Sequence, residues 1–306
     1  MNNLLKQLPN EHIRSILFRI HHQSPFGTFS STAQRFGLRR FKVTSITDLR
    51  KLDDELCSLT SDSPFNQWLS HGGGNYMMPF MTKGETNEVR RFFQGEALQF
   101  MSIHAQTLHN KVWRYCSVCR DNDLDIYGTS YYHQPHQIAG VFHCYKHGCE
   151  LISSCLKCGY QLSDLDRAPV PPAVCPACGY EMQKDDGHFD DFMHDIESFC
   201  LSLNQQLAKF TLNDIQRKNL NYIGTSEADI NTLAFKYRVS AWNQELWNSL
   251  GKSRLQRYFK NTKELKGVTM SPTLRTPRYF LKDSSFNYSP PLVYILAMHA
   301  TGTFPE

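Results

Sequence analysis

The sequence predicts a mainly α protein that contains small zinc-binding modules of mixed α and β structure. Apolar residues recur at helical spacing on both sides of the middle of the chain, where seven cysteines and a histidine are paired. We expect a helical N-terminal domain with helix-turn-helix character over residues 1–112, with an ordinary bundle as the alternative. A tandem zinc-binding module over 113–182 and a helical C-terminal domain with a basic segment over 183–306 are expected to follow.

The first expected helix follows Asn10, a candidate N-cap, and has apolar residues at helical spacing from residue 13 to residue 20. This spacing leaves Arg14 and Arg19 outward. The next helices are expected over residues 31–36, 49–59 and 89–101. The glycine-rich run 71–75 lacks the lysine of a phosphate-binding loop, and we expect it to be a flexible turn.

Two longer helices are expected in the C-terminal domain. One carries an apolar stripe from residue 189 to residue 207, which indicates a core helix. The other runs over residues 230–250, with Leu233 and Tyr237 on its apolar side, and is closed by Gly251. Between these helical parts, residues 127–133 and 139–143 are short strand-like runs.

Paired metal ligands are the most specific feature of the chain. The pairs are Cys116 with Cys119, Cys144 with His147, Cys155 with Cys158, and Cys175 with Cys178. Each pair lets one tight turn direct two side chains at the same ion, and two pairs complete the closed tetrahedron of a structural zinc site. We therefore predict two structural zinc ions. The first two pairs form the first site, and the last two form the second site.

Disulfides and a three-coordinate catalytic zinc are the alternatives left open. The N-terminus lacks the features of a signal peptide, and no apolar run approaches the ~20 residues that span a bilayer. We therefore expect a cytoplasmic protein with reduced thiols, which favours metal. Four protein ligands leave no open position for substrate, so we do not expect an enzyme. Cys149 is the nearest substitute for His147, whereas Cys57 and Cys200 are expected to be core residues.

A basic segment is the best candidate for contact with a nucleic-acid backbone. Residues 252–282 contain nine Lys and Arg, a single acid at Glu264, and interleaved aromatic residues. The basic residues are Lys252, Arg254, Arg257, Lys260, Lys263, Lys266, Arg275, Arg278 and Lys282. A solvated helix face followed by a basic loop is the alternative.

Two further constellations could carry chemistry. The first comprises Asp190, Asp191, His194 and Asp195. Helical spacing brings these groups near one another, as in a metal-dependent nuclease, but acids in the first turn of a helix are also common. The second comprises His133 and His136, for which a positioning or hydrogen-bonding role is favoured over metal binding because eight better-paired ligands are present.

Several runs of the sequence match the pattern of a known family. They are residues 115–119, 125–128, 131–141 and 144–148, together with Pro9, Glu11, Ser15 and Arg19. With these motifs the chain resembles the TniQ family, especially its TnsD-like members, over about residues 8–180. Residues 225–306 look like the helical continuation of TnsD-like proteins. Ser117 and Tyr145 stand where the family commonly has proline, which leaves the ligands intact.

The resemblance implies a target-site selector for a transposon with a multi-protein transposase. Such proteins connect a chosen DNA site to a TnsC-like AAA+ ATPase, which recruits the transposase. The family's zinc ligands map onto the eight paired residues given above. The helix that carries Glu11, Arg14 and Arg19 is the candidate contact for the ATPase, and an ordinary core helix is the alternative.

Other functions are kept as alternatives. Because the chain ends at Glu306, where many TnsD-like proteins continue into further DNA-binding helices, it could instead be the adaptor of an RNA-guided CRISPR-associated transposon complex. A generic zinc-stabilised nucleic-acid-binding scaffold is the third hypothesis. A homodimer is left open, and no membrane partner is expected.

Overall fold

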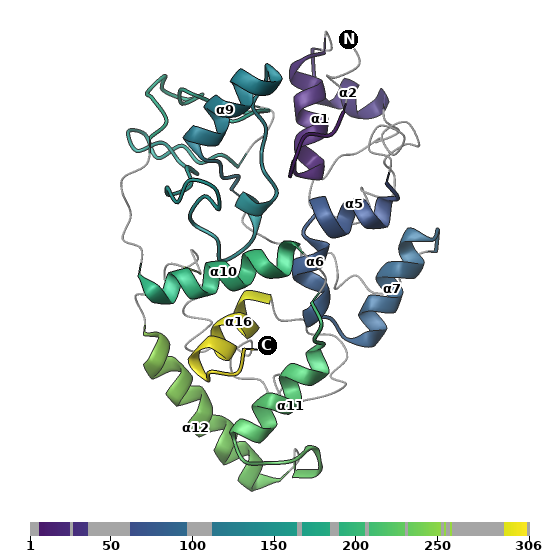
Figure 1. Ribbon diagram of the computed structural model, residues 1–306, viewed down its shortest axis with the longest axis vertical. Coiled ribbons are helices and arrows are strands. Elements are labelled where there is room, and N and C mark those ends of the chain that lie inside the picture. The colour runs from purple at the N-terminus through teal and green to yellow at the C-terminus, as the bar shows by residue number, and fades with distance from the viewer. Residues whose placement is uncertain are drawn as a thin grey trace. The chain divides into compact units, whose positions relative to one another are not determined.

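The computed structural model describes residues 6–24, 27–35, 62–96, 112–163, 167–183, 190–205, 208–229, 232–251, 254, 258 and 291–304 (Figure 1). Within these residues the protein is mainly helical, and its β structure is confined to isolated antiparallel bridges. The predicted mainly α fold class is therefore confirmed. The expected helix over 49–59, Cys57 and most of the basic segment lie outside the described residues.

The chain forms two compact units. The first unit comprises residues 1–76 and 89–206, and the second comprises residues 77–88 and 207–306. The paired metal ligands therefore belong to the same unit as the N-terminal helices. The predicted division at residues 112 and 182 follows sequence modules and stays a prediction.

Helices are the main regular structure of the described chain. Those of the first unit are α1 (Ile13–His22), α2 (Phe29–Arg35), α5 (Pro64–His71), α9 (Ser117–Tyr127) and α10 (Asp191–Gln205). Those of the second unit are α11 (Leu212–Tyr222), α12 (Leu233–Leu250) and α16 (Pro291–Ala300), while α6 (Gly74–Met77) and α7 (Lys83–Phe93) cross the division. No helix among the described residues is long and apolar enough to cross a membrane.

Helix α1 forms where the sequence predicts it, and it packs against α2 and α5 (Figure 1). Its predicted apolar face is buried. The N-cap is His12 rather than Asn10, because Nδ1 of His12 accepts a hydrogen bond from the Arg14 N–H group at 3.2 Å. Asn10 instead has a φ of 56°, a left-handed conformation that asparagine tolerates better than most residues.

The glycine-rich run after α5 is closely packed, which corrects the expectation of a flexible turn. A Cβ atom on Gly72 would lie 2.9 Å from the carbonyl oxygen of Trp68, and one on Gly74 would lie 2.7 Å from its ring. Glycine is needed at these positions because the backbone passes directly over the indole. The expected helix over 89–101 is also corrected, since α7 begins at Lys83 and ends at Phe93 before a turn at Gly95.

Helix α10 confirms the predicted core stripe over its described part. Met193, Ile196 and Leu203 are buried at helical spacing. The Asp190 carboxylate accepts a hydrogen bond from the Met193 N–H group at 2.8 Å. This contact gives Asp190 a capping role at the helix start.

In the second unit, α12 packs against α16 and ends before Gly251, as predicted. Its predicted apolar side is only partly right, because Leu250 is buried but Leu233 and Tyr237 are 66% and 69% exposed. Phe235 and Trp242 lie on the buried side instead. Two apolar rows compete on this helix, and the row with the large aromatic side chains buries more area.

Candidate metal centres

Three turns of one design carry the paired ligands between residues 144 and 178. In each turn, the carbonyl of the first cysteine accepts a hydrogen bond from the N–H group of the glycine four residues later, at 2.8–2.9 Å. The cysteine and glycine pairs are Cys144 with Gly148, Cys155 with Gly159, and Cys175 with Gly179. These glycines have φ values of 68–71°, which a residue without Cβ adopts without strain. We call these turns the knuckles.

The remaining pair lies at the start of α9, a helix that was not expected from the sequence. Cys116 is its N-cap, and Sγ of Cys116 accepts a hydrogen bond from the Cys119 N–H group at 3.4 Å. The strand-like runs expected over 127–133 and 139–143 are wrong. Among these described residues, His133 pairs singly with Glu11 and His143 pairs singly with Glu150, so neither run forms a ladder.

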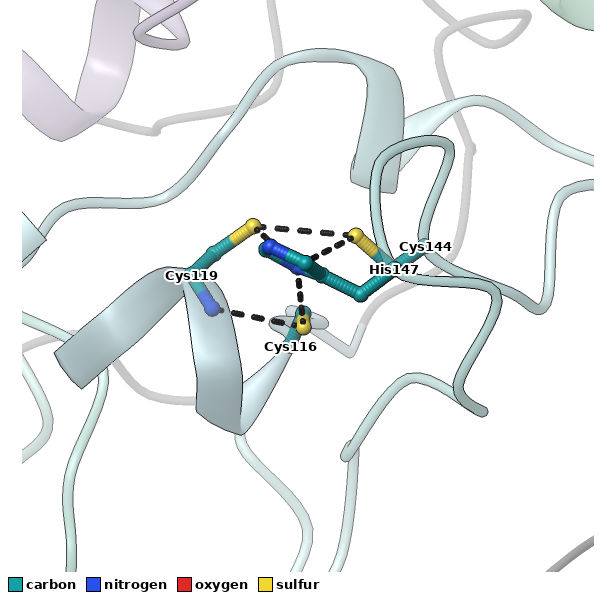
Figure 2. A group of neighbouring side chains, drawn as sticks. All are labelled: Cys116, Cys119, Cys144 and His147. Carbon is teal, nitrogen blue, oxygen red and sulfur yellow. Dashed lines mark hydrogen bonds between the residues drawn. The ribbon is translucent and has the colours of Figure 1, made fainter. Parts of the chain in front are cut away.

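The first site is assembled from the start of α9 and one knuckle (Figure 2). The donor atoms of Cys116, Cys119, Cys144 and His147 all lie within 4.8 Å of one another. Sγ of Cys119 is 3.6 Å from Sγ of Cys144 and 3.4 Å from Nδ1 of His147. Ligands of a tetrahedral zinc ion are separated by about 3.5–3.8 Å, so the geometry fits this ion.

The second site is assembled from the other two knuckles. The sulfur atoms of Cys155, Cys158, Cys175 and Cys178 also lie within 4.8 Å of one another. The Sγ atoms of Cys155 and Cys178 are 3.7 Å apart, and those of Cys158 and Cys175 are 3.6 Å apart. Cys155 and Cys175 are buried in the core of the first unit, whereas Cys158 and Cys178 are exposed.

The electrostatics of both sites favour a bound cation. At the first site, hydrogen bonds from Cys119 and Cys144 lower the pKa of the Cys116 thiol, and hydrogen bonding to Cys116 raises the pKa of Cys119. At the second site, a hydrogen bond from the backbone N–H group of Cys158 lowers the pKa of Cys155 to about 7. One thiolate therefore forms readily in each group and opposes ionisation of its neighbours, and a divalent cation would remove this conflict.

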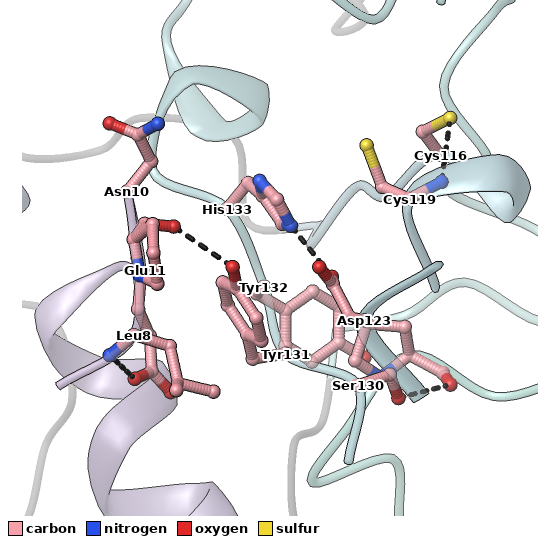
Figure 3. Close-up of polar contacts among 12 residues, drawn as sticks. Leu8, Asn10, Glu11, Cys116, Cys119, Asp123, Ser130, Tyr131, Tyr132 and His133 are labelled. Atoms are coloured by element: carbon pink, nitrogen blue, oxygen red, sulfur yellow. Dashed lines mark hydrogen bonds and ion pairs between the residues drawn. The ribbon is translucent and has the colours of Figure 1, made fainter. Parts of the chain in front are cut away.

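The N-terminal segment is joined to the loop that precedes the first knuckle (Figure 3). The His12 N–H group donates to the carbonyl of Tyr132 at 2.9 Å, and the Gln134 N–H group donates to the carbonyl of Asn10 at 2.7 Å. The hydroxyl of Tyr131 donates to the carbonyl of Pro9 at 3.0 Å. Two motifs more than 100 residues apart in the sequence thus form one structural element.

The predicted outward position of Arg19 is wrong. Its side chain is 1% exposed and forms two hydrogen bonds of 2.9 Å to the Glu11 carboxylate, which is itself fully buried. Burial is possible because the guanidinium group matches a carboxylate with parallel hydrogen bonds. Neither side chain is therefore at the surface for a direct contact with a partner. Arg14, the third proposed contact residue, is half-buried.

Two buried charged residues hold the loop that leads into Cys144, and sequence reasoning missed both. Arg114 donates to the carbonyls of Ile138, at 2.9 Å, and Val141. The Glu197 carboxylate of α10 accepts from the Phe142 N–H group at 2.9 Å. Burial lowers the pKa of Arg114 to about 10, so it stays charged at neutral pH. The one sequence signal was a lone acid in the apolar stripe of α10.

The two histidines of residues 133–136 and the described cysteines outside the ligand sets make contacts that indicate structural roles. Nε2 of His133 is 2.7 Å from Oδ2 of Asp123, and Nε2 of His136 is 3.4 Å from Sγ of Cys144. These contacts agree with the favoured hydrogen-bonding role. Sγ of Cys149 lies 3.2 Å from Sγ of Cys116, beside the first site, and Cys200 is a fully buried core residue as predicted.

The sequence predicts two other candidate sites, a basic nucleic-acid-binding segment and an acidic cluster. Of the predicted nucleic-acid-binding residues, the described part of the chain includes only Arg254, which is exposed. The acids and histidine between residues 190 and 195 do not form a group of three or more converging ligands within the described residues. The nuclease hypothesis therefore gains no support from the geometry of this helix.

Comparison with known families places the N-terminal segment and the first site in one family domain. The family model named TniQ matches residues 4–151. The chain is a TniQ-domain protein. No curated protein was found to match it. The TniQ match indicates a transposition-associated protein, and it covers the N-terminal segment, α1, α9 and all four residues of the first site. The second site lies beyond the matched residues of the TniQ domain.

Proposed function

We propose that this TniQ-domain protein is a TnsD-like, non-catalytic target-site selection factor of a multi-protein DNA transposon. It binds target DNA, or a complex already on target DNA, and recruits a TnsC-like AAA+ ATPase. The observation that carries the proposal is the TniQ match over residues 4–151. In support of it, the motifs that carry the resemblance contact one another at the N-terminal segment and the loop around Tyr132.

The proposed cofactors are two zinc ions, one at each site. Cys116, Cys119, Cys144 and His147 would hold one ion, and the four cysteines of the second site would hold the other. Zinc bound to four protein ligands supplies folding free energy and has no open position for substrate. The proposed role of both ions is therefore to stabilise the first unit.

Within this proposal, residues 252–282 contact the phosphate backbone. Nine basic side chains would release counterions on binding, so affinity should fall by about 0.9 log unit per contact for each log unit of salt on duplex DNA. Replacing Arg254, Arg257 and Lys260 with Glu should weaken binding and flatten this dependence. Unchanged affinity and salt slope would assign the segment to a solvated surface or a protein contact.

The deciding experiment is purification of the tagged protein from its bacterial host with nucleic acid retained. We expect an AAA+ ATPase and DNA to copurify, and targeted insertion to require the protein. Copurification of a guide RNA with a CRISPR effector would favour the adaptor alternative instead. Recovery of neither ATPase nor nucleic acid would reject target selection and leave the zinc-stabilised scaffold. Sedimentation of the purified chain distinguishes a monomer from a homodimer.

The contact with the ATPase can be tested on α1. Arg14→Glu should reduce ATPase recruitment and insertion while zinc content and thermal unfolding stay unchanged, because Arg14 is half-buried rather than part of the core. Arg91→Glu is a matched control, since Arg91 is exposed and pairs with Glu96. Insertion at wild-type frequency with the Arg14 variant would place the ATPase contact elsewhere.

A further inference from the structure

His136 is a buried side chain in direct contact with a ligand of the first site. It is fully inaccessible to solvent, and its Nε2 atom lies 3.4 Å from Sγ of Cys144. It lies in the short helical turn Pro135–Gln137, outside the knuckle that carries Cys144. The contact is therefore not imposed by the knuckle itself.

The ring of His136 is held by a stack of aromatic side chains. It packs against His133 with ring centroids 5.0 Å apart, and His133 packs against Tyr131 at 4.5 Å with nearly parallel rings. His133 is fixed in turn by a 2.7 Å contact between its Nε2 atom and Oδ2 of Asp123, a residue of α9 (Figure 3). Because Cys116 is the N-cap of α9 and Cys119 lies within this helix, the stack links both ligand pairs of the first site.

The hydrogen-bonding pattern assigns the proton on His136. Its Nδ1 atom is buried and has no hydrogen-bond partner in the described structure. A neutral imidazole has one donor and one acceptor nitrogen, and burying an N–H group without an acceptor costs more than leaving a lone pair unused. A metal-bound thiolate has no proton to donate. The proton therefore belongs on Nε2, which donates to the sulfur of Cys144.

The second site is built differently. In the described structure, the hydrogen bonds to its sulfur atoms come from backbone N–H groups, as from Ala177 to Cys175 at 3.4 Å, or from other cysteines of the site. Three thiolates, a neutral histidine and Zn²⁺ carry a net charge of −1 at the first site, in a buried setting. A side-chain donor to one thiolate disperses that charge and orients the ligand.

We propose that His136 is an outer-sphere positioning residue of the first site, whose Nε2–H group donates to the Cys144 thiolate, and that His133 and Asp123 hold its ring in place. The proposal rests on metal occupancy of the first site, as proposed above. It extends the site beyond its ligand set and gives the two histidines of residues 133–136 separate tasks. His136 acts on the ligand, and His133 acts on His136.

The first test compares variants of the full chain loaded with cobalt(II). His136→Leu should move the thiolate-to-cobalt charge-transfer band to lower energy, because the thiolate loses its hydrogen-bond donor. It should also lower the binding affinity for one of the two metal ions by about 10–100-fold. His136→Gln, which keeps an N–H group near the same position, should restore most of both effects. His21→Leu is the matched control, since this histidine of the same unit contacts Thr32 rather than sulfur.

The second test needs no variant and so does not depend on folding of the Leu protein. In wild-type protein loaded with NMR-active cadmium, the Nε2 proton of His136 should be visible and should show a scalar coupling to one cadmium ion. An unprotonated Nε2, or a protonated one without coupling, overturns the proposal. Normal metal uptake with identical cobalt spectra for wild type and His136→Leu also overturns it. A wild-type protein that binds no metal at the first site overturns the zinc proposal and this one together.

Discussion

The first and second sites use similar turns but differ in how they are supported. Three of the four donor residues are buried at the first site, whereas two are exposed at the second. The first site is held by Arg114, Glu197 and His136, which come from outside its knuckle. The second site consists of two knuckles joined by a proline-rich connector. The first site is therefore part of the architecture of the TniQ domain, whereas the second lies beyond that domain and has only its two inner cysteines in the core of the first unit.

This difference predicts where a bound zinc ion would matter most for folding. Around the first site, buried hydrogen bonds and ion pairs would persist in part without metal. Around the second site, the hydroxyl groups of Tyr115 and Tyr132 hold the connector through the carbonyls of Pro172 and Ala168, at 2.6 and 3.0 Å. Among the described contacts, the exposed ligands Cys158 and Cys178 receive no hydrogen bond from a side chain outside the second site. We therefore expect the second site to depend more completely on its ion.

The largest expected effect is the loss of folding when both metals are removed. Thiolate-bound zinc supplies on the order of 10 kcal/mol per site in small zinc domains, so chelation should unfold residues 113–182. Cys116→Ser and Cys155→Ser should each remove one zinc, as measured by elemental analysis of the purified chain. If folded wild-type protein contains fewer than two zinc ions per chain, the model with two zinc sites is wrong.

The rate of metal release should separate the two sites next. Because Cys158 and Cys178 are exposed, a thiol-directed reagent should release the second ion at least about tenfold faster than the first, giving two phases. A dye that binds free zinc reports both phases. Cys158→Ser identifies the fast phase if that phase disappears and the slow one stays. Release of both ions in one phase would show that the sites are equally protected.

Breaking the Glu11–Arg19 ion pair tests whether the N-terminal segment supports the first site. Glu11→Ala leaves a buried guanidinium group without its partner and should lower the free energy of unfolding by about 3–5 kcal/mol. Replacing both residues with Met should cost less than the single change, because no buried charge is then left unpaired. Denaturant unfolding of zinc-loaded protein measures both. A single variant as stable as wild type would mean that the pair contributes little.

Particular residues show what the sequence could and could not predict. The ligand pairs were predictable because a knuckle needs only two cysteines and a glycine at fixed spacing, a local rule. Arg19 was misplaced because its position on α1 is read as outward until Glu11, eight residues earlier, is known to fold back beside it. That contact depends on the turn at Asn10 and on pairing with residues 132–134, which no local pattern encodes.

The same reasoning explains why α9 was not predicted and why the buried side of α12 was predicted only in part. In α9 the apolar residues Val118, Leu124, Ile126 and Tyr127 are exposed, so the helix has no buried stripe for a periodicity search to find. In α12, two apolar rows fit helical spacing equally well, and only tertiary packing selects the row with Phe235 and Trp242. Helix positions were therefore more predictable than the faces they bury.

A smaller effect should come from the buried acid behind the first site. Glu197→Gln removes the charge that accepts from Phe142 N–H and His143 Nδ1, and should lower stability by about 1–3 kcal/mol. Glu181→Gln is the matched control, because Glu181 is exposed near the second site. Thermal unfolding and zinc affinity are the measurements. If both variants weaken metal binding to the same extent, side-chain support does not distinguish the two sites.

The smallest effect lies in the second unit and serves as a reference that neither site should influence. The Asp214 carboxylate accepts from the Thr211 hydroxyl at 2.7 Å and the Thr211 N–H group at 2.8 Å, and these bonds lower its pKa. A lowered pKa in the folded state means that the capping stability is present above pH ~4 and is lost as pH falls through the folded pKa.

Asp214→Asn should therefore be less stable than wild type near neutral pH, and the difference should shrink as pH falls below ~4. Because Asp214 is largely exposed, we expect a difference of only a few tenths of a kcal/mol, discounted for solvent screening. The measurement is the difference in unfolding free energy between the two proteins at each pH. Because acid releases metal from both proteins alike, that effect cancels in the difference. Zinc content at neutral pH should be identical. If the variant loses zinc, the second unit supports the metal sites. The difference between the first and second sites could then not be explained by the residues around each site alone.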